Sequence, residues 1–174
     1  MKYNRASALL LVIILCSFGF VYRGDGTPVS GNKQGQAHSP HVMVNSDQVK
    51  WGPAPPSLPP GAQLAVLDGD PSKAGAPFTM RVKFPGGYKV PPHWHPIDEN
   101  VVVLKGVLMM GVGEKFNEAA AHEMREGTFA KMPKETRHYA WTKTETVIQV
   151  HGIGPFEVTY VNASDDPRNK TSSK

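Results

Sequence analysis

The sequence predicts an all-β domain, built as a sandwich or a closed barrel, with at most one short helix. Three observations predict this class: the apolar runs are short, turn residues separate nearly all of them, and one run alternates cleanly between apolar and polar side chains. A chain of 174 residues is long enough for one ordinary domain with a real core and too short for two comfortable ones. We therefore expect a single folded domain.

The strands are expected where the apolar runs lie, at residues 63–67, 78–84, 100–104 and 107–112, and later near Thr128, His138, Thr146 and Glu157. The run from Phe78 to Phe84 splits into apolar and polar positions with a period of two, which is typical of a half-buried strand. The remaining helix candidate is one or two turns near residues 117–122, with Asn117 as the N-cap. Short strands at regular intervals with almost no helix favour a sandwich or a barrel.

The first residues have the layout of a secretory signal peptide. Lys2 and Arg5 precede an uncharged and largely apolar run over residues 6–22. Small residues at Ser17 and Gly19 fit the small-x-small rule of signal peptidase. We therefore expect cleavage after Gly19, so that residues 1–19 form the signal peptide and the mature protein is exported, either to the periplasm or out of the cell.

Two alternatives for the leader stay open. A lipoprotein could be anchored at Cys16, although this class needs a small residue where the chain has Leu15. The leader could also remain as an uncleaved anchor, because its uncharged run reaches the lower limit of a membrane span. In either case the membrane would be contacted only through the leader. Cys16 is the one cysteine of the sequence, so no disulfide is expected in the mature protein.

Composition divides the rest of the chain into three parts. Residues 20–49 are dominated by polar residues, Gly and Pro, and we expect a flexible linker there. Residues 50–162 form the predicted β-barrel domain, which opens with a proline-rich stretch expected to wrap the outside of a sheet. Residues 163–174 are a polar tail.

The distribution of charge argues against a nucleic-acid partner. The formal net charge is +4, but Lys and Arg nearly balance Asp and Glu between Lys50 and Asn162. The excess of positive charge therefore lies in the leader, the linker and the tail. Binding to nucleic acid needs basic residues concentrated on one face of a domain, and the sequence shows no such concentration.

One short segment combines residues that bind metal ions. His93 and His95 are two positions apart, so in a strand both imidazoles leave the same face. Glu99 follows after enough chain to turn and bring a carboxylate back toward them. Any one of these residues alone is ordinarily a surface residue or a satisfied polar group. Together on an apolar wall they would be buried and unpaired, which is costly, and a cation resolves the conflict.

This segment resembles the first motif of the cupin superfamily, with the motif's residues in register at Gly87, His93, His95, Glu99 and Gly106. Residues 127–142 are similar to the second cupin motif, with Gly127, Pro133 and His138 at matching positions. The chain has Glu135 where the family has a turn glycine, and Thr142 where it has an asparagine. Because glycine at that turn normally supplies a positive φ, we expect a turn of different shape at Glu135.

The resemblance implies a double-stranded β-helix, or jelly-roll, barrel with one divalent metal ion inside, often packed as a homodimer. It implies His93, His95, Glu99 and His138 as the metal ligands. The small single-domain cupins that resemble the cupin part of the ChrR anti-sigma factor look nearest. Nitrogen and oxygen ligands of this kind suit Fe, Mn, Ni, Zn or Cu, and the sequence does not rank these metals.

His151 is a further candidate, as a proton acceptor for catalysis. Val147, Gln149 and His151 share one face of a predicted strand, and we expect that face to line the pocket. A histidine at the rim of the barrel is the alternative interpretation.

Three hypotheses about function stay open. The first is a metal-binding cupin of undetermined activity. The second is an Fe(II)-type dioxygenase that acts on a small oxygenated organic substrate at a coordination position left free by the protein ligands. The third is a noncatalytic, zinc-stabilised sensor or ligand-binding module. Only the site can decide among them, since one fold hosts many functions.

Overall fold

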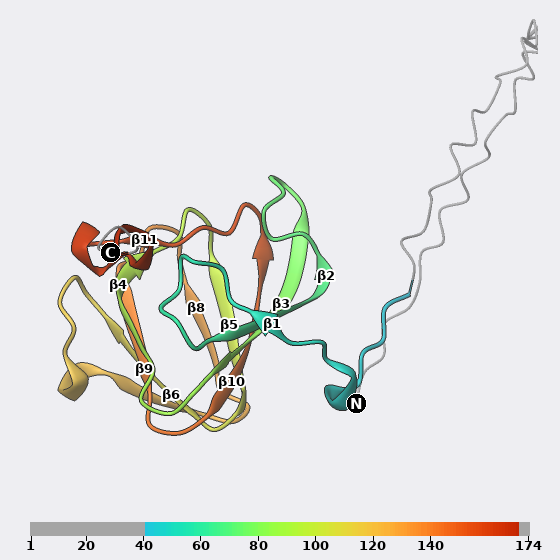
Figure 1. Ribbon diagram of the computed structural model, residues 1–174, viewed down its shortest axis with the longest axis horizontal. Helices are drawn as coiled ribbons and strands as arrows, with labels where there is room; N and C mark the ends of the chain where they lie inside the picture. Colours follow the sequence, from blue (N-terminus) through green and yellow to red (C-terminus); the bar gives the residue numbers. More distant parts are fainter. Residues whose placement is uncertain (1–40, 171–174) are drawn as a thin grey trace, which may run out of the picture. The chain divides into compact units, whose positions relative to one another are not determined.

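The computed structural model describes residues 41–170. The predicted signal peptide over residues 1–19 and most of the predicted linker lie outside the described residues. Within residues 41–170, eleven strands form two antiparallel sheets that face each other (Figure 1). No helix in this part of the chain is long and apolar enough to cross a membrane. The prediction of an all-β jelly-roll barrel is confirmed.

Sheet A has six strands in the spatial order β1-β2-β3-β10-β5-β8, namely β1 (Gly52–Pro53), β2 (Gln63–Gly69), β3 (Pro77–Phe84), β10 (Thr146–Ile153), β5 (Glu99–Lys105) and β8 (Phe129–Met132). Sheet B has five strands in the order β11-β4-β9-β6-β7, namely β11 (Thr159–Tyr160), β4 (Lys89–Trp94), β9 (His138–Thr142), β6 (Val107–Val112) and β7 (His122–Arg125). From β3 onward the chain crosses between the sheets after every strand except β6, which is followed by β7 in the same sheet. Each cupin-like motif therefore has one strand in each sheet, with β4 and β5 in the first motif and β8 and β9 in the second.

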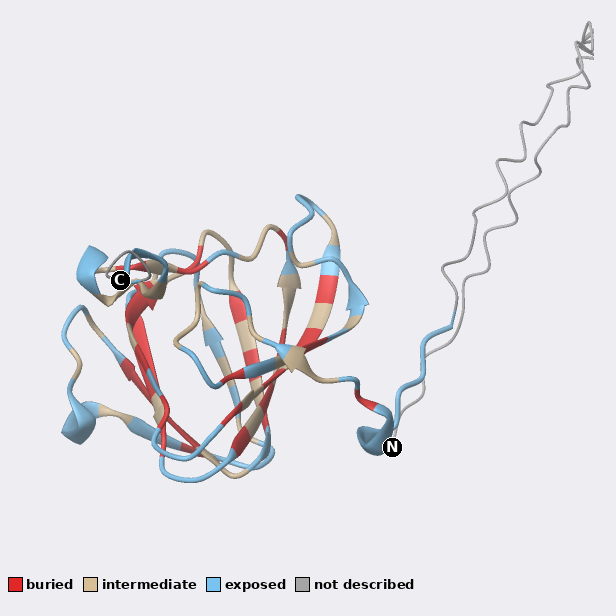
Figure 2. Ribbon diagram, in the orientation of Figure 1, coloured by how far each residue is buried: buried red, intermediate tan, exposed pale blue. Residues whose placement is uncertain are grey.

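Each sheet turns its apolar side toward the other sheet. Strand β3 shows this most clearly, because its buried side chains alternate with half-exposed or exposed ones along its whole length. Its four buried residues are Phe78, Met80, Val82 and Phe84. Buried positions recur along the strands of both sheets, as Figure 2 shows in red. The core therefore occupies the space between the sheets, as the period-two pattern of this strand predicts.

Helical structure in residues 41–170 is confined to single 3-10 turns. The predicted turn near Asn117 is present as η2 (Glu118–Ala120), and the Asn117 side chain accepts a hydrogen bond from the Ala119 amide at 3.0 Å. The three others are η1 (Ser46–Gln48), η3 (Ala163–Asp165) and η4 (Pro167–Asn169). The last two lie in the predicted polar tail, where Arg168 Nη2 donates to the Val158 carbonyl at 3.0 Å.

The proline-rich segment over residues 53–60, which we call the proline strap, is fastened to the barrel by two buried tyrosines. Tyr160 donates its hydroxyl hydrogen to the Ser57 carbonyl at 2.8 Å, and Tyr88 donates to the Pro59 carbonyl. From the sequence, this stretch is expected only to wrap the outside of a sheet. In the structure it also lines the internal cavity described below, through Pro53, Pro55, Ser57 and Leu58.

Candidate metal centre

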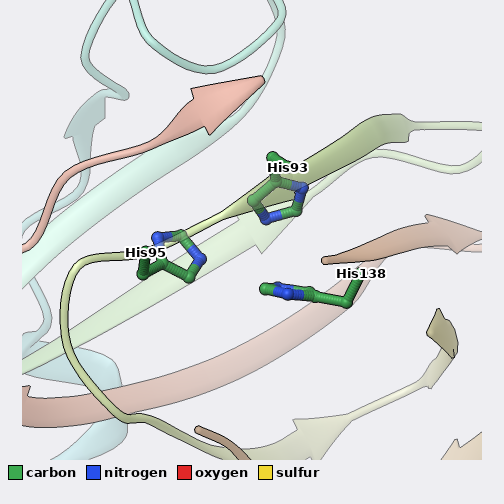
Figure 3. Close-up of side chains that lie close together, drawn as sticks. All are labelled: His93, His95 and His138. Atoms are coloured by element: carbon green, nitrogen blue, oxygen red, sulfur yellow. The ribbon is translucent and has the colours of Figure 1, made fainter. Parts of the chain in front are cut away.

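Three histidines meet inside the barrel, from strands that pair in sheet B. His93 lies in β4, His95 directly follows that strand, and His138 begins β9. All three are buried, and one ring nitrogen of each lies within 4.8 Å of one from each of the others. Their rings point toward one another (Figure 3). The structure thus brings together the three histidines that the sequence analysis singled out.

A bulge in β4 turns His93 toward the cavity. Val90 pairs with Ala140 and His93 pairs with His138, so β4 advances three residues while β9 advances two. Strict alternation would place Val90 and His93 on opposite faces, yet both line the cavity. The extra residue is absorbed at Pro91 and Pro92, which suits a bulge because proline has no amide hydrogen to pair.

Backbone carbonyls orient the three imidazoles. The Nδ1 atom of His93 lies 2.8 Å from the Pro91 carbonyl oxygen, and that of His138 lies 2.9 Å from the Thr136 carbonyl oxygen. His95 Nδ1 lies 2.7 Å from the Glu157 carbonyl oxygen. A carbonyl can only accept, so each Nδ1 carries the hydrogen and each neutral ring keeps its lone pair on Nε2. Neutral histidines held in this way are the form that binds a metal.

The turn at Glu135 keeps the shape that glycine gives, against the sequence prediction. Glu135 has a φ of +62°, in the left-handed region that glycine adopts freely. Its amide donates to the His95 carbonyl oxygen at 2.8 Å. The next residue, Thr136, supplies the carbonyl that orients His138. These contacts explain why the turn conformation is maintained without glycine: the turn joins the two motifs of the site.

The carboxylate of Glu99 lies beside the histidines. Its Oε2 atom is 3.3 Å from His138 Nε2 and 3.6 Å from His95 Nε2, and the residue is 7% exposed. Burial by itself would raise the pKa of Glu99, but the charges of His95 and His138 and a hydrogen bond to His138 outweigh burial and lower the pKa to about 2. The carboxylate is therefore ionised at neutral pH and available as a ligand.

The three histidines differ in their affinity for a proton. Burial lowers the pKa of His93 well below its usual range, and the nearby histidines add to this effect. Burial also lowers the pKa of His95, although the Glu99 carboxylate opposes the change. Burial acts in the same direction on His138, but its hydrogen bond to Glu99 and the carboxylate's charge outweigh burial and raise its pKa. Without a metal, His138 is thus the histidine of the cluster that holds a proton most readily.

The residues of the cluster fit a metal ion. Within residues 41–170, the Nε2 atom of His95 is buried and has no hydrogen-bond partner. An unpaired buried nitrogen is costly and uncommon in folded proteins. A cation bound between the three Nε2 atoms would satisfy it, and the Glu99 carboxylate would compensate part of the added charge.

A cavity of about 430 Å³ reaches the cluster. Its lining includes the four predicted ligands, His93, His95, Glu99 and His138. The remaining lining is mostly apolar and comes from both sheets and the proline strap, with residues such as Met80, Phe84, Leu108, Met110, Val150 and Phe156. A volume of this size lies within the usual range for small-molecule sites.

The prediction for His151 is wrong. In β10 the side chains that line the cavity are Ile148 and Val150, whereas Val147, Gln149 and His151 lie on the opposite, half-exposed face. Successive side chains of a strand point to opposite faces, so Ile148 and Val150 face the interior while the face that carries His151 points away from it. His151 is therefore not placed to accept a proton from a molecule in the cavity.

Sequence reasoning missed two partners of His95. The Phe156 ring stacks on the His95 ring with centroids 4.4 Å apart and an interplanar angle of 22°. The Glu157 carbonyl orients the same imidazole. The sequence gives a weak indication of Phe156, which is a large apolar side chain near the end of the domain. It gives no indication of the Glu157 carbonyl, because every residue has a backbone carbonyl.

The fold is shared with solved cupin structures. The polyketide cyclase RemF from Streptomyces resistomycificus aligns with a TM-score of 0.57 and 18% identity, over 76% of this chain and 94% of that chain. A protein provisionally named an acetylacetone dioxygenase, from Methylibium petroleiphilum, gives 0.57 and 20%, over 76% and 88%. An RmlC-like cupin from Shewanella frigidimarina gives 0.50 and 14%, over 66% and 91%. At these identities the likeness shows the fold alone.

Sequence comparison identifies the family. A search of curated proteins found no match. One family model matches residues 30–159, which is most of the chain and includes all four predicted ligands. The likeness to the cupin part of the ChrR anti-sigma factor stays a prediction. Because this model matches most of its residues, the chain belongs to the family described as Domain of unknown function (DUF4437).

Proposed function

We propose that this protein is a cupin that binds one divalent metal ion through His93, His95, His138 and Glu99, and that the ion faces a cavity for a small organic molecule. The unpaired, buried Nε2 atom of His95 carries the proposal, because it lies where a cation would satisfy it. The carbonyl contacts of the three Nδ1 atoms support it, since each neutral ring then keeps its lone pair on Nε2. The proton that His138 shares with Glu99 would be released when the ion binds.

The protein residues would hold and orient the bound molecule. A divalent ion at this site would supply Lewis-acid polarisation of an oxygen atom, or electron transfer if the metal is redox-active. Glu99 is the anionic residue of the cavity lining in residues 41–170, and its carboxylate would compensate part of the charge of the ion. The apolar lining would exclude water from the reacting end of the molecule.

Cobalt substitution tests whether the ion keeps a free coordination position. The protein would be loaded with Co(II), and its visible absorption spectrum recorded with and without azide. We expect the weak bands of a five- or six-coordinate ion, and a change in the bands when azide binds. Intense tetrahedral bands that azide does not change would contradict a free position and favour the noncatalytic, zinc-stabilised alternative.

The dioxygenase hypothesis is the second candidate, and the cavity favours it. A cavity that reaches the metal ligands can place an organic molecule beside the ion, which a purely structural site does not need. The test is oxygen uptake by the Fe(II)-loaded protein with a panel of small oxygenated substrates. Uptake that depends on substrate and is lost in His95→Ala would support this candidate. Full iron occupancy with no turnover across a broad panel would count heavily against it.

Export remains part of the proposal. Lys2 and Arg5, followed by the apolar run over residues 6–22, support a cleaved leader. Expression of the full chain followed by mass determination of the exported form tests it. We expect a mass that corresponds to cleavage after Gly19. A full-length mass in the membrane fraction would instead support an uncleaved anchor.

A further inference from the structure

The wall of the cavity away from the histidines has a uniform chemical character. Among residues 41–170, the lining contains no Lys and no Arg, and Glu99 is its one acidic residue. Ser57 and Ser72 are its hydroxyl side chains. The rest is aliphatic, aromatic, proline or methionine. A charged or polyhydroxylated molecule would lose its hydration there and find few partners in return.

The proline strap completes this apolar wall. Pro53, Pro55 and Leu58 belong to the lining, together with side chains contributed by both sheets. Proline fixes its own φ, so the strap presents these side chains on a stiff backbone. The Tyr160 hydroxyl holds the strap at Ser57, and the Tyr160 ring lies 6.0 Å from that of His93. The strap is thereby joined to Tyr160, whose ring lies beside the histidine cluster.

We infer that the cavity takes an uncharged, mainly apolar molecule with one or two rings or a short carbon chain, and with one oxygen-bearing end. The carbon skeleton packs against the apolar wall and the strap, and the oxygen lies at the histidine cluster. This inference deepens the proposed function, on which it rests for the metal, by naming the class of bound molecule. Sugars, sugar acids and phosphorylated compounds are excluded by the same wall.

Calorimetric titration of the metal-loaded protein tests the inference with 2-naphthol as the apolar probe, and with gluconate and inorganic phosphate as polar probes. We expect 2-naphthol to bind at least about tenfold more tightly than either anion. Its binding should show a negative change in heat capacity, the mark of buried apolar surface. Equal or tighter binding of gluconate or phosphate, or no binding of 2-naphthol, would overturn the inference.

Variants locate the probe. Leu58→Lys places a charge in the lining at a half-buried strap position, and we expect it to weaken 2-naphthol binding about tenfold or more. Leu104→Lys is the matched control, because Leu104 is exposed and outside the lining. Leu64→Gln, also in the lining, gives a second reading if Leu58→Lys does not fold. Equal binding by the lining variants and the control would overturn the inference.

The metal content of the same preparations separates the two proposals. If the protein binds 2-naphthol in the cavity but retains no metal after the loading step, the proposed function fails and the assignment of the cavity wall stands. If it binds metal but no 2-naphthol, the class of molecule named here is wrong and the metal site stands.

Discussion

The two halves of the histidine cluster are built in different ways. His93, His95 and Glu99 come from one short stretch of chain, whereas His138 arrives through the pairing of β9 with β4, where it lies opposite His93. The first half depends on the local bulge in β4. The second depends on a turn that is joined to the first half by the bond from the Glu135 amide to the His95 carbonyl. The local half supplies most of the donors, and the distant half closes the site.

Removal of the distant donor should have the largest effect. His138→Ala leaves the cluster open on one side, and we expect the metal content and the melting temperature both to fall. The loss of metal affinity should exceed the roughly 10- to 100-fold that loss of a ligand's supporting partner causes. Elemental analysis and thermal unfolding measure the two effects.

His122→Ala is the matched control for that variant, because His122 is an exposed histidine of the same sheet. It should keep both the metal and the melting temperature of the parent protein. An unchanged metal stoichiometry in His138→Ala would show that His138 is not a ligand and that His93, His95 and Glu99 hold the ion by themselves.

Glu99→Gln should change the pH dependence of the metal-free protein. The folded-state pKa of Glu99 is about 2, below the ordinary value of 4.5, so its ionised form stabilises the fold. That stability is fully present above about pH 4.5 and is lost as the pH falls toward 2. The variant should therefore lose stability less steeply in acid than the parent protein does.

The same substitution should affect the alkaline side. Glu99 raises the pKa of His138, so the protonated histidine contributes stability that is present below the ordinary value of 6.5 and is lost as the pH rises through the raised pKa. Glu99→Gln removes this contribution. Thermal unfolding of both metal-free proteins from pH 3 to pH 9 measures the two limbs. Parallel curves across the range would show that Glu99 does not interact with the cluster.

Backbone conformation at the second motif should give the smallest effects, and of opposite sign. Glu135→Gly relieves a left-handed φ that costs about 1–2 kcal/mol, offset by about 0.5–1 kcal/mol from glycine's greater freedom in the unfolded chain. We expect a net gain in the free energy of unfolding of between about 0 and 1.5 kcal/mol. Gly127→Ala imposes the same kind of strain at φ +82°, where an added Cβ meets nothing within 4 Å, and should lose about 1 kcal/mol.

Denaturant unfolding compares the two variants with the parent protein. A loss of stability in Glu135→Gly would mean that the glutamate side chain makes a contribution larger than the strain of its backbone. Metal content should be unchanged in both, since neither residue lines the cavity or belongs to the histidine cluster.

The comparison also explains what could be predicted from the sequence. The contiguous half was predictable because the spacing of His93 and His95 and the alternation in strands such as β3 are local properties. His138 was predicted through the resemblance of residues 127–142 to a cupin motif, since no local rule links it to His93. The bulge at Pro91 and Pro92 was not predicted, although consecutive prolines within a strand favour a bulge.

Two errors have a common physical origin. His151 was placed in the pocket because its chemistry suited a catalytic site, although the apolar face of the same strand, with Ile148 and Val150, was the better candidate for the interior. Strand β7 was not predicted, because a single buried residue, Met124, marks it as part of the sheet. In both cases the buried positions of the strand, Ile148 and Val150 in β10 and Met124 in β7, show which face packs in the interior.

The most direct measurement of the central claim is the metal content of the unaltered protein, purified without added metal and determined by elemental analysis against protein concentration. We expect about one divalent ion per chain, released on acidification as the histidines take up protons. A folded protein that carries no metal, and that takes up none when Fe, Mn, Ni, Zn or Cu is supplied, would contradict the claim that this cluster is a metal centre.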